Sequence, residues 1–121
     1  MGAQHLQRGR WGEDFAVRHL ERLGLTVIDR NWRCREGEID IVAEEAATDT
    51  IVICEVKTRS SEDFGSPLAA VTPRKLRRLR VLAGEWLRSH DRHARQVRID
   101  VVGILLSNSG APHVEHLRGV A

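Results

Sequence analysis

The stretch IVICEVK, at residues 51–57, indicates the fold more clearly than any other part of the chain. Its β-branched residues are typical of a strand. Because both faces of that strand would be largely apolar, we expect a central strand that is covered on both sides. Glu55 and Lys57 share one face with the two isoleucines, so a carboxylate stands where a core residue would be expected.

The segments on either side of this strand alternate between helix and strand patterns. Residues 38–44 are expected to pair with it through a turn at residues 46–49. The predicted order, α-β-β-β-α-β, indicates one α/β domain over residues 1–121, with a mixed central sheet flanked by helices. The other expected elements are a helix at 9–23, a strand at 25–32, a loop at 58–71, a helix at 73–89 with Thr72 as N-cap, a strand at 97–106 and a weakly patterned tail from about 107.

The composition is that of an ordinary soluble domain, with 41% apolar and 30% charged residues. The net charge of +2 permits a nucleic-acid partner without requiring one. The first ten residues contain no apolar leader core, and no run approaches the ~18 apolar residues of a membrane span. Cys34 and Cys54 lie outside any C-x-x-C pattern, which argues against a disulfide framework or a zinc site. We therefore expect a reduced, cytoplasmic protein without a membrane segment.

Three carboxylates interrupt the apolar pattern at positions that are expected to be buried. Asp40 stands between Ile39 and Ile41, Glu13 falls in one helical row with the apolar residues 16, 17 and 20, and Glu55 is the third. Burying an unpaired carboxylate costs several kcal/mol, roughly, and three that converge would repel one another. A bound cation would relieve that repulsion.

Phosphodiester hydrolysis requires a hard divalent ion, a positioned water and a cation near the phosphate. Asp40 and Glu55 could hold Mg²⁺ or Mn²⁺ through carboxylate oxygens, with Glu13 completing the ligand set. Lys57 could orient or deprotonate the water. Structural explanations stay open for each residue: an exposed Glu55–Lys57 ion pair, a dipole contact for Glu13 and turn amides for Asp40. The coincidence of all of them favours a catalytic interpretation.

These residues resemble the PD-(D/E)xK nuclease pattern, with Asp40 followed by Glu55-Val56-Lys57. More narrowly, the chain resembles the YraN-like family of small bacterial proteins, which is related by fold to archaeal Holliday junction resolvases. The resemblance covers residues 9–106, and its matching stretches are G-E (12–13), N-W-R-C-R-E-G-E-I-D (31–40), E-V-K-T-R (55–59), F-G-S-P (64–67), A-V-T-P-R-K (70–75) and R-I-D-V-V (98–102).

The resemblance implies a restriction-endonuclease-like fold, a metal site at Glu13, Asp40 and Glu55 with Lys57 beside it, and a nucleic-acid substrate. Glu-Ile stands before Asp40 where the name-giving pattern has proline. By analogy with the related resolvases, a homodimer is expected.

The second predicted helix is basic in its first turns. Five cations lie between residues 74 and 80, although cations at that end oppose the helix dipole by ~0.3–1 kcal/mol each. Phosphate contacts explain this placement better than a merely solvated face. With 4% aromatic residues and no tyrosine, backbone or shape recognition is favoured over a single-strand stacking platform. The predicted nucleic-acid contacts are Arg59, Arg74, Lys75, Arg77 and Arg78.

The remaining polar residues carry weaker signals. The pairs His90/His93 and His113/His116 are expected at the surface, and Asp100 is expected to pair with a nearby arginine. The favoured function is a Mg²⁺- or Mn²⁺-dependent endonuclease that hydrolyses DNA, with branched or damaged DNA as candidate substrates. The alternatives are a nucleic-acid-binding module of the same fold without turnover and an interaction protein whose acids are merely paired.

Overall fold

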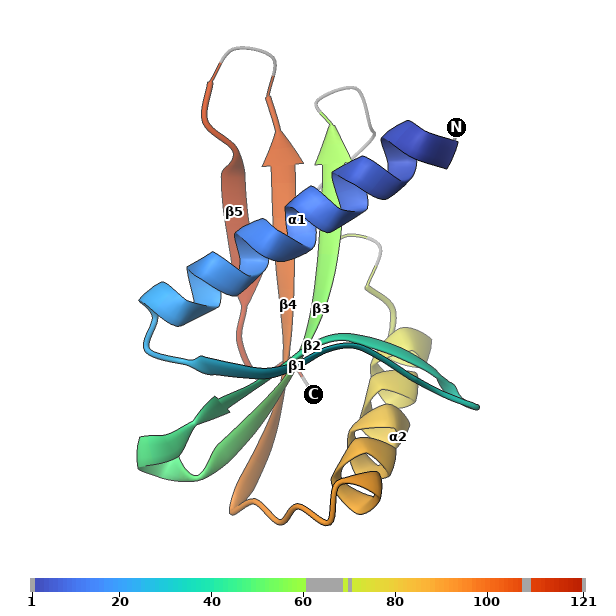
Figure 1. Cartoon of the computed structure of the whole chain (residues 1–121), viewed down its shortest axis with the longest axis vertical. Helices are drawn as coiled ribbons and strands as arrows, with labels where there is room; N and C mark the ends of the chain where they lie inside the picture. Colours follow the sequence, from blue (N-terminus) through green and yellow to red (C-terminus); the bar gives the residue numbers. More distant parts are fainter. Residues whose placement is uncertain (1, 61–68, 70, 108–109, 121) are drawn as a thin grey trace.

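The computed structural model describes residues 2–60, 69, 71–107 and 110–120, and for residues 2–8 the backbone alone. Along the chain, helix α1 precedes all the strands, and α2 follows β3 and precedes β4 (Figure 1). The elements are α1 (Gly2–Arg22), β1 (Thr26–Cys34), β2 (Gly37–Glu45), a short 3-10 helix η1 (Ala46–Thr48), β3 (Thr50–Ser60), α2 (Pro73–Ser89), β4 (Gln96–Leu106) and β5 (His113–Leu117).

The strands form a five-stranded sheet in the order β1-β2-β3-β4-β5. Neighbours pair antiparallel except β3 and β4, which run parallel across the α2 crossover. The mixed α/β sheet that the sequence indicated is therefore confirmed, with β3 at its centre.

The two helices cover opposite faces of the sheet. Alternate residues of β3 face different clusters: Val52 and Cys54 pack with Ala16 and Leu20 of α1. Ile51 and Ile53 instead pack in the cluster that contains the apolar face of α2. The central strand is thus covered on both sides, as the run of apolar residues at 51–54 predicts.

Helix α2 begins where the sequence indicates. The Thr72 side chain accepts a hydrogen bond from the Lys75 amide at 3.2 Å, and Pro73 occupies the first turn. At the other end, Trp86 Nε1 donates to Asp29 Oδ2 at 2.8 Å, which ties α2 to β1. This second contact holds the basic helix beside the strands that carry the acids.

Two expectations about the elements are wrong. Helix α1 begins at Gly2, seven residues earlier than predicted, and β3 continues through Ser60 into the predicted loop, where Thr58 to Ser60 pair with β4. The weakly patterned tail adds a fifth strand, β5, which pairs with β4.

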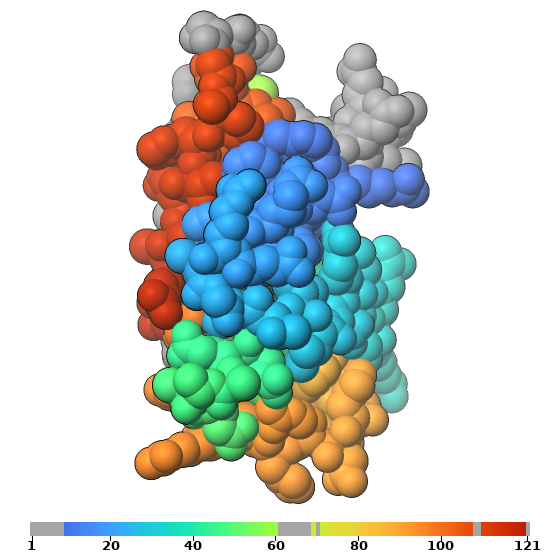
Figure 2. Space-filling view, turned by 60° about the vertical axis from the view of Figure 1, so that its left-hand side comes forward, coloured from blue at the N-terminus to red at the C-terminus, as the bar shows by residue number. Residues whose placement is uncertain are grey.

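His116 of β5 is not a surface residue. Its side chain is 9% exposed, and its Nε2 lies 2.8 Å from Asp100 Oδ2. Its Nδ1 lies 3.0 Å from Nε2 of His19 in α1. Figure 2 shows the blue surface of α1 next to the red surface of the C-terminal segment that contains β5. Contacts between distant segments bury this histidine, and local sequence carries no sign of them.

In the part of the chain that the structure describes, no helix is both long and apolar enough to cross a membrane.

Candidate metal centre

The site lies where β2 separates from β3. The paired register of these strands ends at Ile41 and Cys54. Just beyond this last pair, the Val56 amide donates to Asp40 Oδ2 at 2.8 Å. The Asp40 carboxylate thus satisfies a backbone donor that has lost its strand partner, and it is held in the gap between the two strands.

The backbone of β1 is irregular opposite Asp40. The register passes from Arg30↔Ile41 to Trp32↔Ile39, which places Asn31 opposite Asp40. Asn31 has a left-handed φ of 52°, a conformation that asparagine tolerates better than most residues. Such backbone strain at a polar cluster is common where a site needs one fixed geometry.

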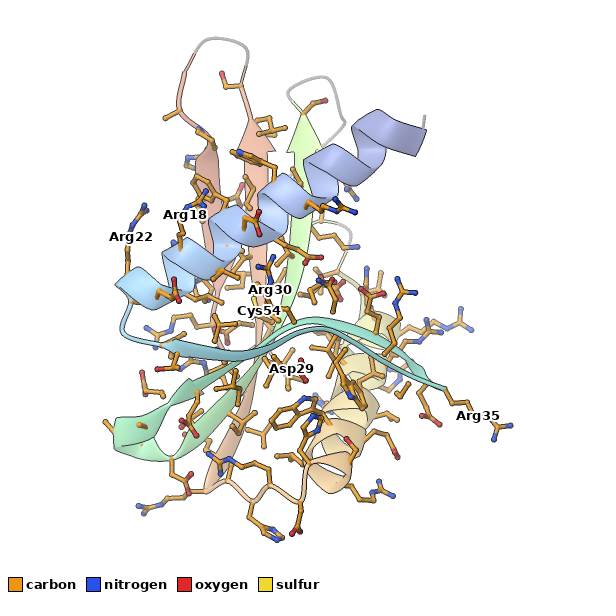
Figure 3. All side chains as sticks on the ribbon, in the orientation of Figure 1. Arg18, Arg22, Asp29, Arg30, Arg35 and Cys54 are labelled. Carbon is orange, nitrogen blue, oxygen red and sulfur yellow. The ribbon has the colours of Figure 1, made fainter. Side chains whose placement is uncertain are left out.

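Helix α1 supplies Glu13 because it crosses β3 at very close range. A Cβ added at Gly12 would lie 2.0 Å from Thr58 Oγ1, so only glycine fits at the crossing. Arg30, labelled in Figure 3, projects from β1 toward α1, where its Nη2 lies 3.7 Å from Glu13 and 2.7 Å from Asp14.

Three carboxylates converge at this point. One oxygen each from Glu13, Glu38 and Asp40 lies within 4.8 Å of the others. Glu38 was missed in the sequence, although it stands two residues before Asp40 on the same predicted strand. It also pairs with Arg33, whose Nε lies 3.0 Å from Glu38 Oε2.

Burial makes two acids of this cluster, Asp40 and Glu13, hard to ionise. It raises the pKa of Asp40 to about 7; the Val56 amide opposes the shift, whereas Glu55, Glu13 and Glu38 reinforce it. Burial likewise raises the pKa of Glu13, against a hydrogen bond from Asn31 and the charge of Arg30. Ionising Asp40 and Glu13 is therefore unfavourable in the folded protein, and a nearby cation would offset that free-energy cost.

Glu55 lies on the side of the gap that faces α2. Its Oε1 is 3.8 Å from Lys57 Nζ and 3.8 Å from Lys75 Nζ, and its side chain is 15% exposed. It is not one of the three clustered acids, so its role as a metal ligand stays a prediction. Burial and the neighbouring Lys57 lower the pKa of Lys75, against the attraction of Glu55.

All but one of the predicted residues line one of two pockets. The first, of about 180 Å³, brings Glu13 and Asp40 together with Lys57 and Arg59. The second, of about 430 Å³, brings Glu55 together with Arg74, Lys75 and Arg78. Arg77 lines neither pocket and is exposed on α2. The motif at residues 64–67 lies outside the described residues.

The donor set fits a hard divalent ion. Carboxylate oxygens are the ligands that Mg²⁺ and Mn²⁺ prefer, and three of them converge from α1 and β2. Sulfur is absent from this group, and Cys54 is buried on the α1 face with its thiol pKa raised by burial.

Asp100 plays the structural part that the sequence suggested. Arg98 donates to it through Nε at 2.9 Å and Nη2 at 3.1 Å, and Gly119 adds its amide at 3.0 Å. Burial alone would raise the pKa of Asp100, but the hydrogen bonds from His116, Arg98 and Gly119 outweigh it and hold the pKa below its usual value.

The sheet and this pocket together define an α/β protein with an acidic candidate metal centre between two separating strands. The chain belongs to the uncharacterised protein family UPF0102, whose family model matches residues 12–104; this is the YraN-like family that the sequence motifs indicated. It is 58% identical over 112 residues to a UPF0102 protein of Beutenbergia cavernae, covering 93% of each chain. It is 52% identical over 123 residues to one of Mycolicibacterium smegmatis, covering 99% of each.

Proposed function

We propose that this protein is a Mg²⁺- or Mn²⁺-dependent nuclease that hydrolyses phosphodiester bonds in DNA. The observation that carries the proposal is the convergence of Glu13, Glu38 and Asp40 beside a pocket that also contains Lys57. Buried acids with raised pKa values in a cleft are typical of functional sites.

Glu13 and Asp40 would hold the ion, with Glu38 or Glu55 completing the carboxylate set. A bound divalent ion supplies charge neutralisation for the phosphate and lowers the pKa of a water molecule. Asp40 is fixed for this task by the Val56 amide, and Glu13 by the close approach of α1 to β3. Preformed ligand geometry of this kind lowers the reorganisation needed at the moment of reaction.

Lys57 would act on the attacking water or on the developing negative charge. It lines the same pocket as Asp40, and its side chain is 21% exposed, so a water molecule can reach it although most of its surface is buried. Glu55 restrains its Nζ from a distance of 3.8 Å, which is too long for a tight ion pair and leaves the ammonium able to reorient.

The basic surface of α2 would hold the DNA backbone. Arg74, Arg77 and Arg78 are exposed, and within the described residues none of them forms an ion pair with an acid. Arg59 lies in the acidic pocket itself, where it would contact the phosphate being cleaved or its neighbour. Contacts of this kind position a nucleic acid without reading its sequence.

A cleavage screen tests the proposal. The full chain is incubated with single-stranded, duplex, flapped and four-way-junction DNA in Mg²⁺, in Mn²⁺ and in a chelator. We expect metal-dependent cleavage of at least one substrate, lost in Glu13→Gln and kept in Glu21→Gln, which makes the same change at an exposed position of α1. DNA binding without cleavage of any substrate would support a binding module instead.

A thermal-shift arm reports the metal separately. Mn²⁺ at ~100 times its dissociation constant adds roughly 2.7 kcal/mol to the free energy of unfolding. A melting temperature unmoved by millimolar Mn²⁺ would contradict the metal centre.

A further inference from the structure

The larger of the two pockets has a lining that the metal centre does not explain. It lies between the start of α2 and the strands that carry the acids, and its volume is about 430 Å³. Leu79 and Leu82 form an apolar wall, and Arg74, Lys75 and Arg78 supply the cations. Pockets of ~300–1,000 Å³ with apolar walls and a few charged groups are typical of sites for small organic ligands.

This pocket is continuous with the carboxylate cluster. Glu38 lines the pocket and is also one of the three clustered acids. Glu55 lines it too, and its Oε1 lies at 3.8 Å from both Lys75, inside the pocket, and Lys57, which lines the smaller one. A group bound in the larger pocket is therefore a direct neighbour of a phosphate at the acids.

A glycine keeps the inner end of the pocket open. Gly37 has a φ of 146°, and a Cβ there would lie 3.6 Å from Leu82 Cδ1 and 3.9 Å from Arg78 Cδ. Any longer side chain would grow into the space between those two residues.

The charges of the lining favour an anion with an apolar part. Within the described residues, no acid pairs with Arg74 or Arg78, although Glu38 and Glu55 lie in the same lining. The carboxylates of Glu38 and Glu55 can accept hydrogen bonds from amino or imino groups, as nucleobase edges provide. A nucleotide combines all these features: a phosphate for the arginines, a flat base for the leucine wall and donors for the acids.

We propose that this pocket receives a single unpaired nucleotide adjoining the scissile phosphate, so that the protein acts on DNA where a strand is already free of its complement. This inference rests on the proposed nuclease function, because it assumes that the adjacent acids are the site of phosphodiester cleavage. A base within a duplex is paired and stacked, so it can enter such a pocket only after it has left the double helix. Extracting it costs a few kcal/mol, and least where the base is already unpaired. Flaps, gaps and single-stranded ends thus become the preferred substrate class over intact duplex.

A binding experiment without metal tests the pocket by itself. The methyl resonances of Leu79 and Leu82 are followed while the full chain is titrated with 5′-phosphorylated thymidine dinucleotide, and separately with inorganic phosphate. We expect the dinucleotide to shift these resonances and phosphate alone to leave them in place. Equal shifts with both probes, or none with the dinucleotide, would overturn the base-binding pocket.

A matched pair of variants tests the substrate class. The double variant Arg74→Gln/Arg78→Gln alters the pocket, whereas Arg77→Gln/Arg80→Gln removes the same charge from exposed positions of α2 that do not line it. Affinity is measured in chelator for a duplex with a three-nucleotide flap and for the same duplex fully paired.

The wild type should prefer the flap by about tenfold or more. The pocket variant should lose that preference, and the control variant should weaken both complexes equally and keep it. Equal affinity of the wild type for both DNAs, or a preference that survives in the pocket variant, would overturn the inference. Cleavage of flap and duplex at equal rates would sink the inference and leave the nuclease standing. A flap preference without any metal-dependent cleavage would support the nucleotide pocket and contradict the nuclease function.

Discussion

Two buried aspartates of this protein have opposite electrostatic surroundings. Asp100 is completely buried, yet Arg98, His116 and Gly119 all donate to it. Asp40 has one backbone donor, and the charges of Glu55, Glu13 and Glu38 add to the effect of burial on it. Asp100 therefore stabilises the fold as a carboxylate, whereas the ionised form of Asp40 is disfavoured unless a cation lies nearby. The same substitution should therefore have opposite effects at the two positions.

Asp40→Asn should stabilise the metal-free protein in a pH-dependent way. The pKa of Asp40 is about 7 in the folded state against an ordinary 3.8, so above pH 4 the unfolded chain releases a proton that the folded protein keeps. The contribution of Asp40 to folding is thus most favourable at low pH and is lost as the pH rises through 7. The free energy of unfolding of the variant should exceed that of the wild type by about 4 kcal/mol at pH 8 and nearly match it near pH 4, and the melting temperatures should differ in the same direction. A variant less stable than wild type at pH 8 would show that the ionised carboxylate holds the fold.

Asp100→Asn should destabilise the protein at neutral pH. The amide presents one acceptor to three donor groups and leaves the Arg98 charge without its partner, a loss of roughly 3–5 kcal/mol. Because the folded-state pKa of Asp100 is lowered, its stabilisation is present above the unfolded value and disappears as the pH falls through the folded one. Urea unfolding at pH 7 and at acid pH measures both effects. The Mn²⁺-induced thermal shift should survive in this variant, and its loss would place Asp100 in the metal centre.

At the scale of elements, the crossing of α1 over β3 positions Glu13. Gly12→Ala would bring a methyl group into Thr58, which forces the helix away from the sheet and moves the neighbouring carboxylate. We expect a lower melting temperature and a weaker Mn²⁺-induced shift. Gly84→Ala in α2 meets nothing within 4 Å and should stabilise by up to ~1 kcal/mol through helix propensity. A Gly12→Ala protein with normal stability and metal response would show that the close contact does not set the site.

The elements that could be predicted from the sequence are those with long periodic apolar patterns. The apolar run at residues 51–54 predicted the central strand, and Thr72, Pro73 and the apolar stripe predicted α2. Strand β5 has two apolar residues in five, and its burial depends on His19 and Asp100, far away in sequence. No local pattern could have shown it.

The candidate site divides in the same way. Glu13 and Asp40 stood out because each interrupts an apolar row. Glu38 gave a weaker signal, since it begins a strand where a polar residue is ordinary. The left-handed backbone of Asn31 could not be predicted, because the periodicity of apolar residues does not specify the backbone conformation of a single residue. Glu55 also stood out in the sequence, but in the structure it lies 3.8 Å from two lysines and is not one of the three clustered acids.

At the scale of the whole molecule, the basic face of α2 and the acidic pocket lie next to each other. Lys75 is on the helix that carries the exposed arginines, and its Nζ lies 3.8 Å from Glu55 Oε1, which is also 3.8 Å from Nζ of Lys57 in the acidic pocket. A polyanion held along α2 is thereby brought to the acids, whose own charge would otherwise repel it. Metal at the acids and DNA on the helix should therefore bind cooperatively.

Neutralising Arg74, Arg77 and Arg78 together should weaken DNA binding about equally for all sequences. Each lost phosphate contact should reduce the slope of log affinity against log salt by about 0.9 on duplex DNA. Fluorescence anisotropy across a salt series measures this slope. A triple variant with the wild-type slope would mean that the arginines are merely solvated.

The most direct test of the central claim is a single-turnover cleavage rate in Mn²⁺, measured beside metal-free DNA affinity for the wild type, Asp40→Asn and Lys57→Met. The wild type should cleave. Asp40→Asn should cleave orders of magnitude more slowly and bind metal-free DNA as tightly or more tightly, because a negative charge near the phosphate path is gone. Lys57→Met should also abolish cleavage but without tighter binding, since it removes a cation. A wild type that cleaves nothing in Mn²⁺, or an Asp40→Asn variant that cleaves as fast as the wild type, would contradict the metal-dependent nuclease.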